Sequence, residues 1–87
     1  MNKRKDIIPN SLKEYRKAAG YRQKDVARMI GLISEDRICH WEKGKNIPNL
    51  INLFKLCSLY HATPTQLYGG LQREIDAQTQ SIRVSKN

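Results

Sequence analysis

Helix start and stop signals recur at short intervals along this chain, and they leave no room for long elements. Glycine follows an apolar-periodic segment at Gly20, Gly31 and Gly44, where it can end a helix. No segment alternates apolar and polar residues in the way that a half-buried strand requires. The 87 residues are enough for one small core. We therefore expect a single all-α domain built from short helices.

Five helices are expected, and the first two are read from their caps. The first covers about residues 11–19, where Ser11 and Glu14 make a capping-box pattern. The second follows Arg22 and ends at Gly31. The apolar stripes of these two helices contain Leu12, Tyr15, Ala19, Val26, Ala27 and Ile30.

The third expected helix opens at Ser34, a good N-cap residue, and closes at Lys43 and Gly44. Glu35 and Asp36 fall in its first turn, where the helix dipole favours acidic side chains. Only a short turn after Gly31 separates it from the second helix. The two helices together make the arrangement of a helix-turn-helix.

The fourth and fifth helices have clear starts. Pro48 and Asn49 begin the fourth, and Thr63 caps the fifth, with Pro64 in its first turn and Gln66 completing a capping box. Apolar residues of the fourth helix repeat at intervals of three and four, which predicts a buried face. We expect the core to include Leu50, Leu53, Phe54, Cys57, Leu67 and the indole of Trp41.

The remaining residues define the domain boundaries. We expect a basic flexible arm over residues 1–10, the helical domain over residues 11–70, and a polar tail over residues 71–87 that is helical to about Ser81. No stretch approaches the roughly 20 apolar residues that cross a bilayer. We therefore expect a cytoplasmic protein with no membrane partner.

The distribution of charge favours a polyanionic partner. The chain has 16 Lys and Arg residues against 8 Asp and Glu residues, a net charge of +8. Residues 1–24 carry eight of these bases and two of the acids, so +6 of the net charge lies there. Such a basic face is typical of nucleic-acid binding. A solvated surface that only keeps the protein from associating is the alternative.

Metal and enzyme chemistry find little support. Cys39 and Cys57 are expected as free thiols. A zinc site with His40 and His61 is disfavoured, because adjacent residues on a helix diverge by about 100°. The chain also lacks a nucleophile–base pair and a phosphate-binding glycine loop. We expect no metal, no cofactor and no enzymatic activity.

Three segments, residues 23–31, 37–44 and 46–48, together resemble the Xre/Cro family of phage-repressor-like helix-turn-helix proteins. The resemblance runs from about Leu12 to Tyr68. It implies a compact five-helix lambda-repressor-like domain whose second and third helices form the helix-turn-helix. It also implies double-stranded DNA as the partner.

The resemblance assigns roles to individual residues. Arg16 and Glu42 match a pair that forms a buried salt bridge, which makes Arg16 structural. The third helix matches the recognition helix, so the residues expected to face bases are Ser34, Glu35, Asp36, Arg37 and His40. Those expected to hold phosphates are Arg22, Gln23, Lys43, Lys45 and Asn46. For the two acids the alternative is that they only complement the helix dipole.

Two positions depart from the family's pattern. The chain advances seven residues from Gly31 to Ile38, one more than the commoner spacing. The extra residue either tilts the third helix or bulges the turn. Arg22 stands where the family usually has a capping Ser or Thr, and it could reach a phosphate instead.

From these features we expect a sequence-specific DNA-binding transcriptional regulator, a repressor that binds a palindromic operator as a homodimer. The alternative is an antitoxin-type or adaptor protein whose main partner is another protein. The tail at residues 71–87 is where such a partner, or a dimer mate, would bind. The family is bacterial or phage in character, which is consistent with the cytoplasm.

Overall fold

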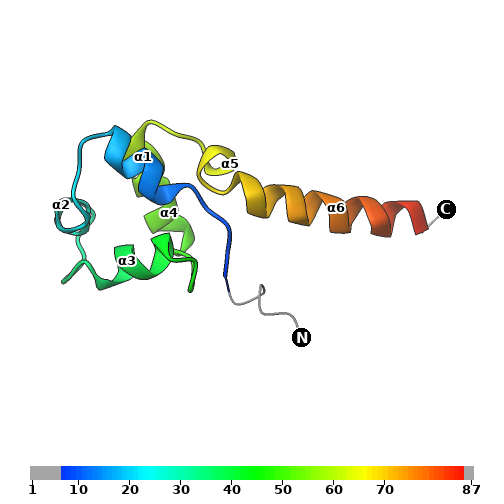
Figure 1. Ribbon diagram of the computed structural model, residues 1–87, viewed down its shortest axis with the longest axis horizontal. Coiled ribbons are helices and arrows are strands. Elements are labelled where there is room, and N and C mark those ends of the chain that lie inside the picture. The colour runs from blue at the N-terminus through cyan, green and yellow to red at the C-terminus, as the bar shows by residue number, and fades with distance from the viewer. Residues whose placement is uncertain (1–6, 86–87) are drawn as a thin grey trace.

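The computed structural model describes residues 7–85, and over this range it consists of six helices without a strand. The all-α fold class predicted from the sequence is confirmed, with one helix more than expected (Figure 1). In chain order the helices are α1 (Leu12–Ala18), α2 (Gln23–Met29), α3 (Asp36–Glu42), α4 (Leu50–Tyr60), α5 (Pro64–Leu67) and α6 (Gly69–Ser85).

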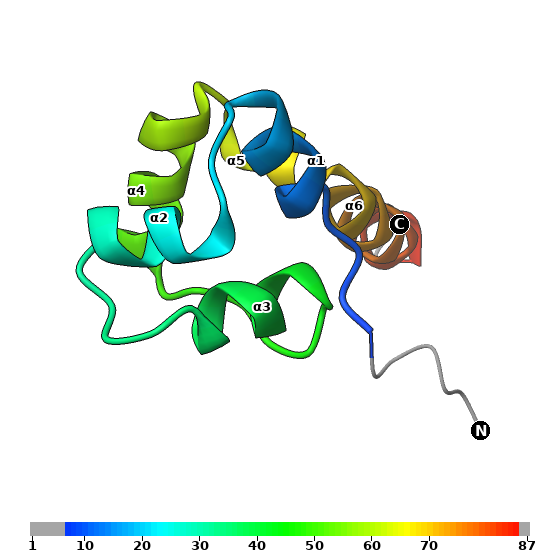
Figure 2. The same ribbon diagram turned by 60° about the vertical axis from the view of Figure 1, so that its left-hand side comes forward.

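Helices α1 to α5 surround one apolar core. α1 packs against α3 and α4, α2 packs against α3, and α4 packs against α5 (Figure 2). Within the core the largest fully buried side chains are Leu12, Ile38, Leu56, Leu67 and Val26. Trp41 is also buried, so it and Leu67 occupy the core as expected.

The face of α4 that the sequence predicts to be buried is not the face that the structure buries. Leu50 and Phe54 are 63% and 55% exposed, and Leu53 and Cys57 are only half-buried. The residues of α4 that point into the core are Asn52, Leu56 and Tyr60. These three follow one another at intervals of four, so they form one row along the helix. Apolar residues thus extend around more of the circumference of α4 than the core covers.

Residues 7–10 do not form the flexible arm that was expected there. The Ile8 backbone N–H donates to the Gly44 carbonyl at 2.8 Å. The Asn10 side-chain amide donates to the carbonyls of Trp41 and Glu42, and its Oδ1 accepts from the Leu12 N–H at 3.0 Å. This segment therefore ties the start of α1 to the end of α3.

Asn10 rather than Ser11 satisfies the start of α1, because the Ser11 side chain makes no capping hydrogen bond. The expected basic cluster Lys3-Arg4-Lys5 lies outside the described residues.

The C-terminal segment is a sixth helix through Ser85, longer than the partly helical tail that was expected. Gly69 and Gly70 begin this helix instead of ending the previous one. A Cβ at Gly70 would lie 2.9 Å from Pro9 Cβ, so a side chain here would displace the N-terminal segment. From Ile75 to Arg83 every side chain is exposed, and α6 extends away from the other helices (Figure 1). Over the described residues, no helix is both long and apolar enough to span a bilayer.

Candidate nucleic-acid interface

The turn between α2 and α3 contains one anchored and one exposed apolar residue. Leu32 is fixed where the turn leaves α2, because its N–H donates to the Ala27 carbonyl at 2.8 Å and its side chain packs against the core. Ile33, the next residue, is fully exposed. The surface of the turn is therefore at Ile33, directly after the anchored Leu32.

A buried polar network joins the first three helices. Arg16 Nε lies 2.6 Å from Glu42 Oε2, and Arg16 Nη2 lies 3.1 Å from Glu42 Oε1, so the guanidinium binds the carboxylate through two hydrogen bonds. The side chains are 9% and 5% exposed. A third hydrogen bond runs from Arg16 to the Tyr21 carbonyl at 3.0 Å. The hydrogen bond to Glu42 raises the pKa of Arg16, so the residue stays charged.

Gln23 completes this network from α2. Its side-chain Nε2 donates to Glu42 Oε1 at 2.9 Å, and the residue is half-buried. Glu42 thus accepts hydrogen bonds from α1 and α2 while it stands at the end of α3. The orientation of α3 relative to α2 is set by this carboxylate as well as by the apolar contacts of Ile38 and Trp41.

The outer side of α3 is a polar, exposed surface. Asp36, His40 and Lys43 follow at intervals of four and three, which at about 100° per residue places them along one line. Ile38 and Trp41 are buried on the opposite side. This line of side chains is therefore presented to solvent by a helix whose other side is fixed in the core.

The start of α3 lies later than expected. Glu35 is the residue that flanks the helix, Asp36 is the first helical residue, and Ser34 belongs to the turn. Ser34 still contributes, because its Oγ accepts from the Asp36 N–H at 3.3 Å. The first hydrogen bond of α3 runs from the Cys39 N–H to the Glu35 carbonyl at 3.0 Å, so Glu35 and not Ser34 is the N-cap. All three side chains are exposed.

Arg37 stands at the edge of the exposed side of α3. It borders a hollow shared with Ile33 and Ser34 of the turn, and a second hollow shared with Asn46 and Asn49 of the loop before α4. The guanidinium thus lies between the two segments that flank α3. From this position it can donate hydrogen bonds to a base edge or to a backbone phosphate.

The expected phosphate ligands lie in two places. Lys43, Lys45 and Asn46 are exposed after the end of α3, around the buried Gly44. Arg22 precedes α2, and its guanidinium is bound to Asp25 through hydrogen bonds of 3.0 and 3.1 Å.

Asp25 takes over the start of α2. Its Oδ2 accepts from the Arg22 backbone N–H at 2.9 Å, which is the bond that the third helical residue makes to the N-cap in a capping box. Hydrogen bonds from Arg22 lower the pKa of Asp25 to about 2. The sequence alone does not indicate this exchange, because a long Arg side chain carries no capping signal of its own.

Side chains that ligate metals do not gather at any one place in the described part of the chain. No group of three His, Cys, Asp or Glu side chains in it could hold an ion, and the thiols of Cys39 and Cys57 are free. The chemistry of the α3 side is instead that of hydrogen-bond donors, acceptors and positive charge. These are the groups that read base edges and neutralise phosphates.

Comparison with known proteins gives one finding. A family model described as "Helix-turn-helix" matches residues 12–67, which runs from the first residue of α1 to the last of α5. No curated protein and no solved structure matches the chain. The family match leaves α6 outside.

Proposed function

Because this chain belongs to the Xre/Cro-like helix-turn-helix family of DNA-binding transcriptional regulators, we propose that it is a sequence-specific repressor that binds a palindromic operator as a homodimer. The observation that carries the proposal is the exposed line of Asp36, His40 and Lys43 on a helix that is otherwise locked in the core. A helix held in this way can enter the major groove as a rigid reading head.

In this proposal α3 reads bases and its surroundings hold the backbone. His40 and Arg37 donate to purine acceptors in the major groove, and Asp36 accepts from the cytosine amino group. Ser34 and Glu35 lie beside them at the turn. Lys43, Lys45 and Asn46 on one side, and Arg22 and Gln23 on the other, bind phosphates and set the register.

The carboxylates at the start of α3 have a second role. Glu35 and Asp36 repel phosphates, so they disfavour placements in which the start of α3 rests on the DNA backbone. Arg37 compensates this repulsion within the same turn. The acids thereby favour insertion into the groove over non-specific binding along the backbone.

The dimer in this proposal is supported by the geometry of DNA recognition. A helix-turn-helix domain reads one half-site, and a two-fold dimer matches half-sites about 34 Å apart on one face of the duplex. Occlusion of a promoter needs no additional activity. We place this repressor in the cytoplasm of a bacterium, encoded by the host or by a phage.

The test is selection of bound duplexes from a random DNA pool at near-physiological salt. The wild type is compared with the double variant Arg37→Ala, His40→Ala, which removes two side chains of the proposed reading head. The matched control is Arg73→Ala, His61→Asn, which changes the same two residue types at exposed positions of α6 and the end of α4. Asn is used at residue 61 because it tolerates the left-handed backbone there.

We expect the wild type and the control to enrich the same palindromic motif, and the double variant to lose or change it. Binding without any enriched motif, or an identical motif from the double variant, would contradict the assignment of α3 as the reading head. Absence of DNA binding at low salt would favour the adaptor-type alternative, in which the partner is a protein.

A further inference from the structure

The apolar stripe of α4 that predicts burial is exposed in the single chain. Leu50 and Phe54 are more than half exposed, and Leu53 and Cys57 beside them on α4 are half-buried. Ile47, in the loop before α4, is 55% exposed. Exposed apolar surface that is contiguous in this way is typical of an interaction site.

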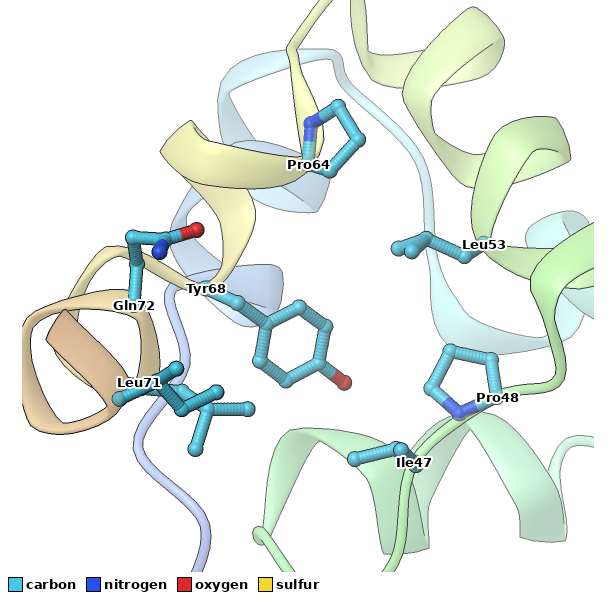
Figure 3. A pocket seen from close by; sticks show the side chains of 8 residues that line it. Ile47, Pro48, Leu53, Pro64, Tyr68, Leu71 and Gln72 are labelled. Atoms are coloured by element: carbon cyan, nitrogen blue, oxygen red, sulfur yellow. The ribbon is translucent and has the colours of Figure 1, made fainter. Parts of the chain in front are cut away.

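This surface continues into a groove between α4, α5 and α6. The groove contains a hollow of about 180 Å³, lined mainly by Ile47, Pro48, Leu53, Tyr68, Leu71 and Ile75 (Figure 3). An apolar cavity of about 150 Å³ accepts a benzene ring. The hollow is therefore large enough for one large apolar side chain of a partner, as in the pockets that receive interface anchors.

The floor of the groove holds an unsatisfied polar group. Tyr68 is 8% exposed, and its hydroxyl has no hydrogen-bond partner although it points into the hollow (Figure 3). A buried hydroxyl without a partner is unfavourable. An occupant that brings a polar atom beside its apolar anchor would relieve this.

Helix α6 extends the same surface beyond the domain. Ile75 and Ile82 are both exposed and are seven residues apart, so they lie on the same side of the helix two turns from each other. A helix of this length is marginal in water without tertiary contacts. The exposed part of α6 is thus an element that gains stability when its apolar side is covered.

The charges on this side suit a second copy of the chain. Although the chain carries +8, the only charged residue of α4 is Lys55, and its ammonium donates to the Ile30 carbonyl at 3.3 Å. The four charged residues of α6, Arg73, Glu74, Asp76 and Arg83, sum to zero. Two copies can therefore approach through α4 and α6 without the repulsion that their basic segments would cause, and α6 has no net positive charge to attract a polyanion.

We propose that the groove between α4, α5 and α6, together with the exposed stripe of α4 and the apolar side of α6, is the homodimer interface. Each copy offers both a hollow and protruding apolar side chains. A two-fold axis lets each copy fill the hollow of the other, which is the self-complementary pattern of an isologous contact. This inference rests on the homodimer of the proposed function and assigns its surface.

The test measures the mass of the protein in solution by sedimentation equilibrium over a range of concentrations. The variants are Phe54→Glu on α4 and Ile75→Glu on α6, both at positions exposed in the single chain. The control is Ile33→Glu, the same exchange at a fully exposed residue outside the groove. Circular dichroism melts establish that each variant folds.

We expect the wild type and Ile33→Glu to form dimers, and Phe54→Glu and Ile75→Glu to raise the dimer dissociation constant by about tenfold or more. A wild type that stays monomeric at every concentration would overturn the inference and leave the groove to a different occupant. Dimers that persist unchanged in both groove variants would also overturn it.

A DNA measurement separates this inference from the proposed function. Ile75→Glu is expected to keep binding to a duplex with one half-site while it loses the tighter binding to the palindrome. If the groove variants are monomeric but the wild type binds no DNA, the interface stands and the repressor function falls. If the groove variants still form dimers and bind the palindrome as tightly as the wild type does, the repressor function stands and the interface that we assign is wrong.

Discussion

Arg16 connects α1 to Glu42 at the end of α3 and to the Tyr21 carbonyl before α2. It lies in the basic N-terminal segment, yet its guanidinium is buried on Glu42 and does not face solvent. The resemblance to the Xre/Cro family pairs these two residues, whereas charge counting alone would assign Arg16 to the DNA-binding surface. A buried charge whose partner is removed has no water to replace it, so the loss is large.

We predict that Arg16→Ala lowers the free energy of unfolding by about 3–5 kcal/mol. Arg22→Ala removes an ion pair whose Arg side chain is 71% exposed, and we expect it to cost less than about 1 kcal/mol. Urea denaturation followed by circular dichroism measures both. Similar decreases in the free energy of unfolding in the two variants would show that the Arg16–Glu42 pair stabilises the fold no more than a surface pair does.

Asp25 makes the stability depend on acid pH. Its pKa is lowered from 3.8 to about 2, so the folded state binds this proton less readily than the unfolded chain. The stabilisation is therefore complete above about pH 4 and is lost as the pH falls toward 2. We predict that Asp25→Asn flattens the fall of the urea midpoint between pH 4 and pH 2. Arg22→Gln should have a similar effect, since the hydrogen bonds from Arg22 are the main cause; an unchanged slope in both would refute this.

Residue contacts that cross the chain were the hardest to predict. Asn10 bonds to the carbonyls of Trp41 and Glu42, more than thirty residues away, and to the N–H of Leu12. Nothing in its neighbours along the sequence marks it, whereas Ser11 and Glu14 carry a capping pattern that the structure does not use. The start of α1 is still satisfied locally, by the Asn10 oxygen two residues before Leu12, but the bonds of the Asn10 amide to α3 have no local pattern that predicts them.

For the helices, capping residues predict where α4 and α5 begin. Glycines are less reliable signals, because some lie where a helix ends and others where a helix begins. Thr63 and Gln66 form the capping box expected for α5, and Asn49 accepts from the Asn52 N–H at the start of α4. Gly69 and Gly70 begin α6, and at Gly70 a Cβ would lie 2.9 Å from Pro9 Cβ. A glycine needed for close approach cannot be told from a glycine needed for a turn by sequence alone.

Gly44 joins two elements through close packing. It has φ of +77°, and a Cβ there would lie 2.6 Å from the Ile8 carbonyl oxygen. Gly20 has a similar φ of +86°, but no atom lies within 4 Å of its Cβ position. The two glycines thus have the same backbone requirement and differ in the space around them.

We predict that Gly20→Ala costs about 1–2 kcal/mol, the strain of the left-handed backbone, and that Gly44→Ala costs clearly more because it displaces residues 7–10 from the end of α3. Thermal melts compare the two variants. Amide hydrogen exchange at Ile8 reports the displacement directly. If both variants lose the same stability, and the Ile8 amide of Gly44→Ala is still protected from exchange, then residues 7–10 accommodate the added methyl group without a free-energy penalty.

For the whole molecule, the helix-turn-helix could be located from the sequence, but the surfaces around it could not be separated. The order of Gln23, Gly31, Trp41, Glu42 and Gly44 is specific enough to identify α2 and α3. The stripe on α4 is different, because an apolar row looks the same whether it faces the core of its own chain or a second copy. Only the packing of Asn52, Leu56 and Tyr60 into the core shows that Leu50 and Phe54 are left outside.

The division of the molecule into a charged side and an apolar side leads to a prediction about salt. If Lys45 binds a phosphate, its counterion is released on binding, and Lys45→Gln should reduce the log–log slope of affinity against salt by about 0.9. Lys17→Gln removes the same charge from an exposed position on α1, outside the helix-turn-helix and the loop after α3, and should leave the slope nearly unchanged. Fluorescence anisotropy with the selected operator, measured over a series of salt concentrations, gives both slopes. Equal reductions would mean that the positive charges act through the overall field of the protein and not through placed contacts, so that the loop after α3 would lose its assigned role.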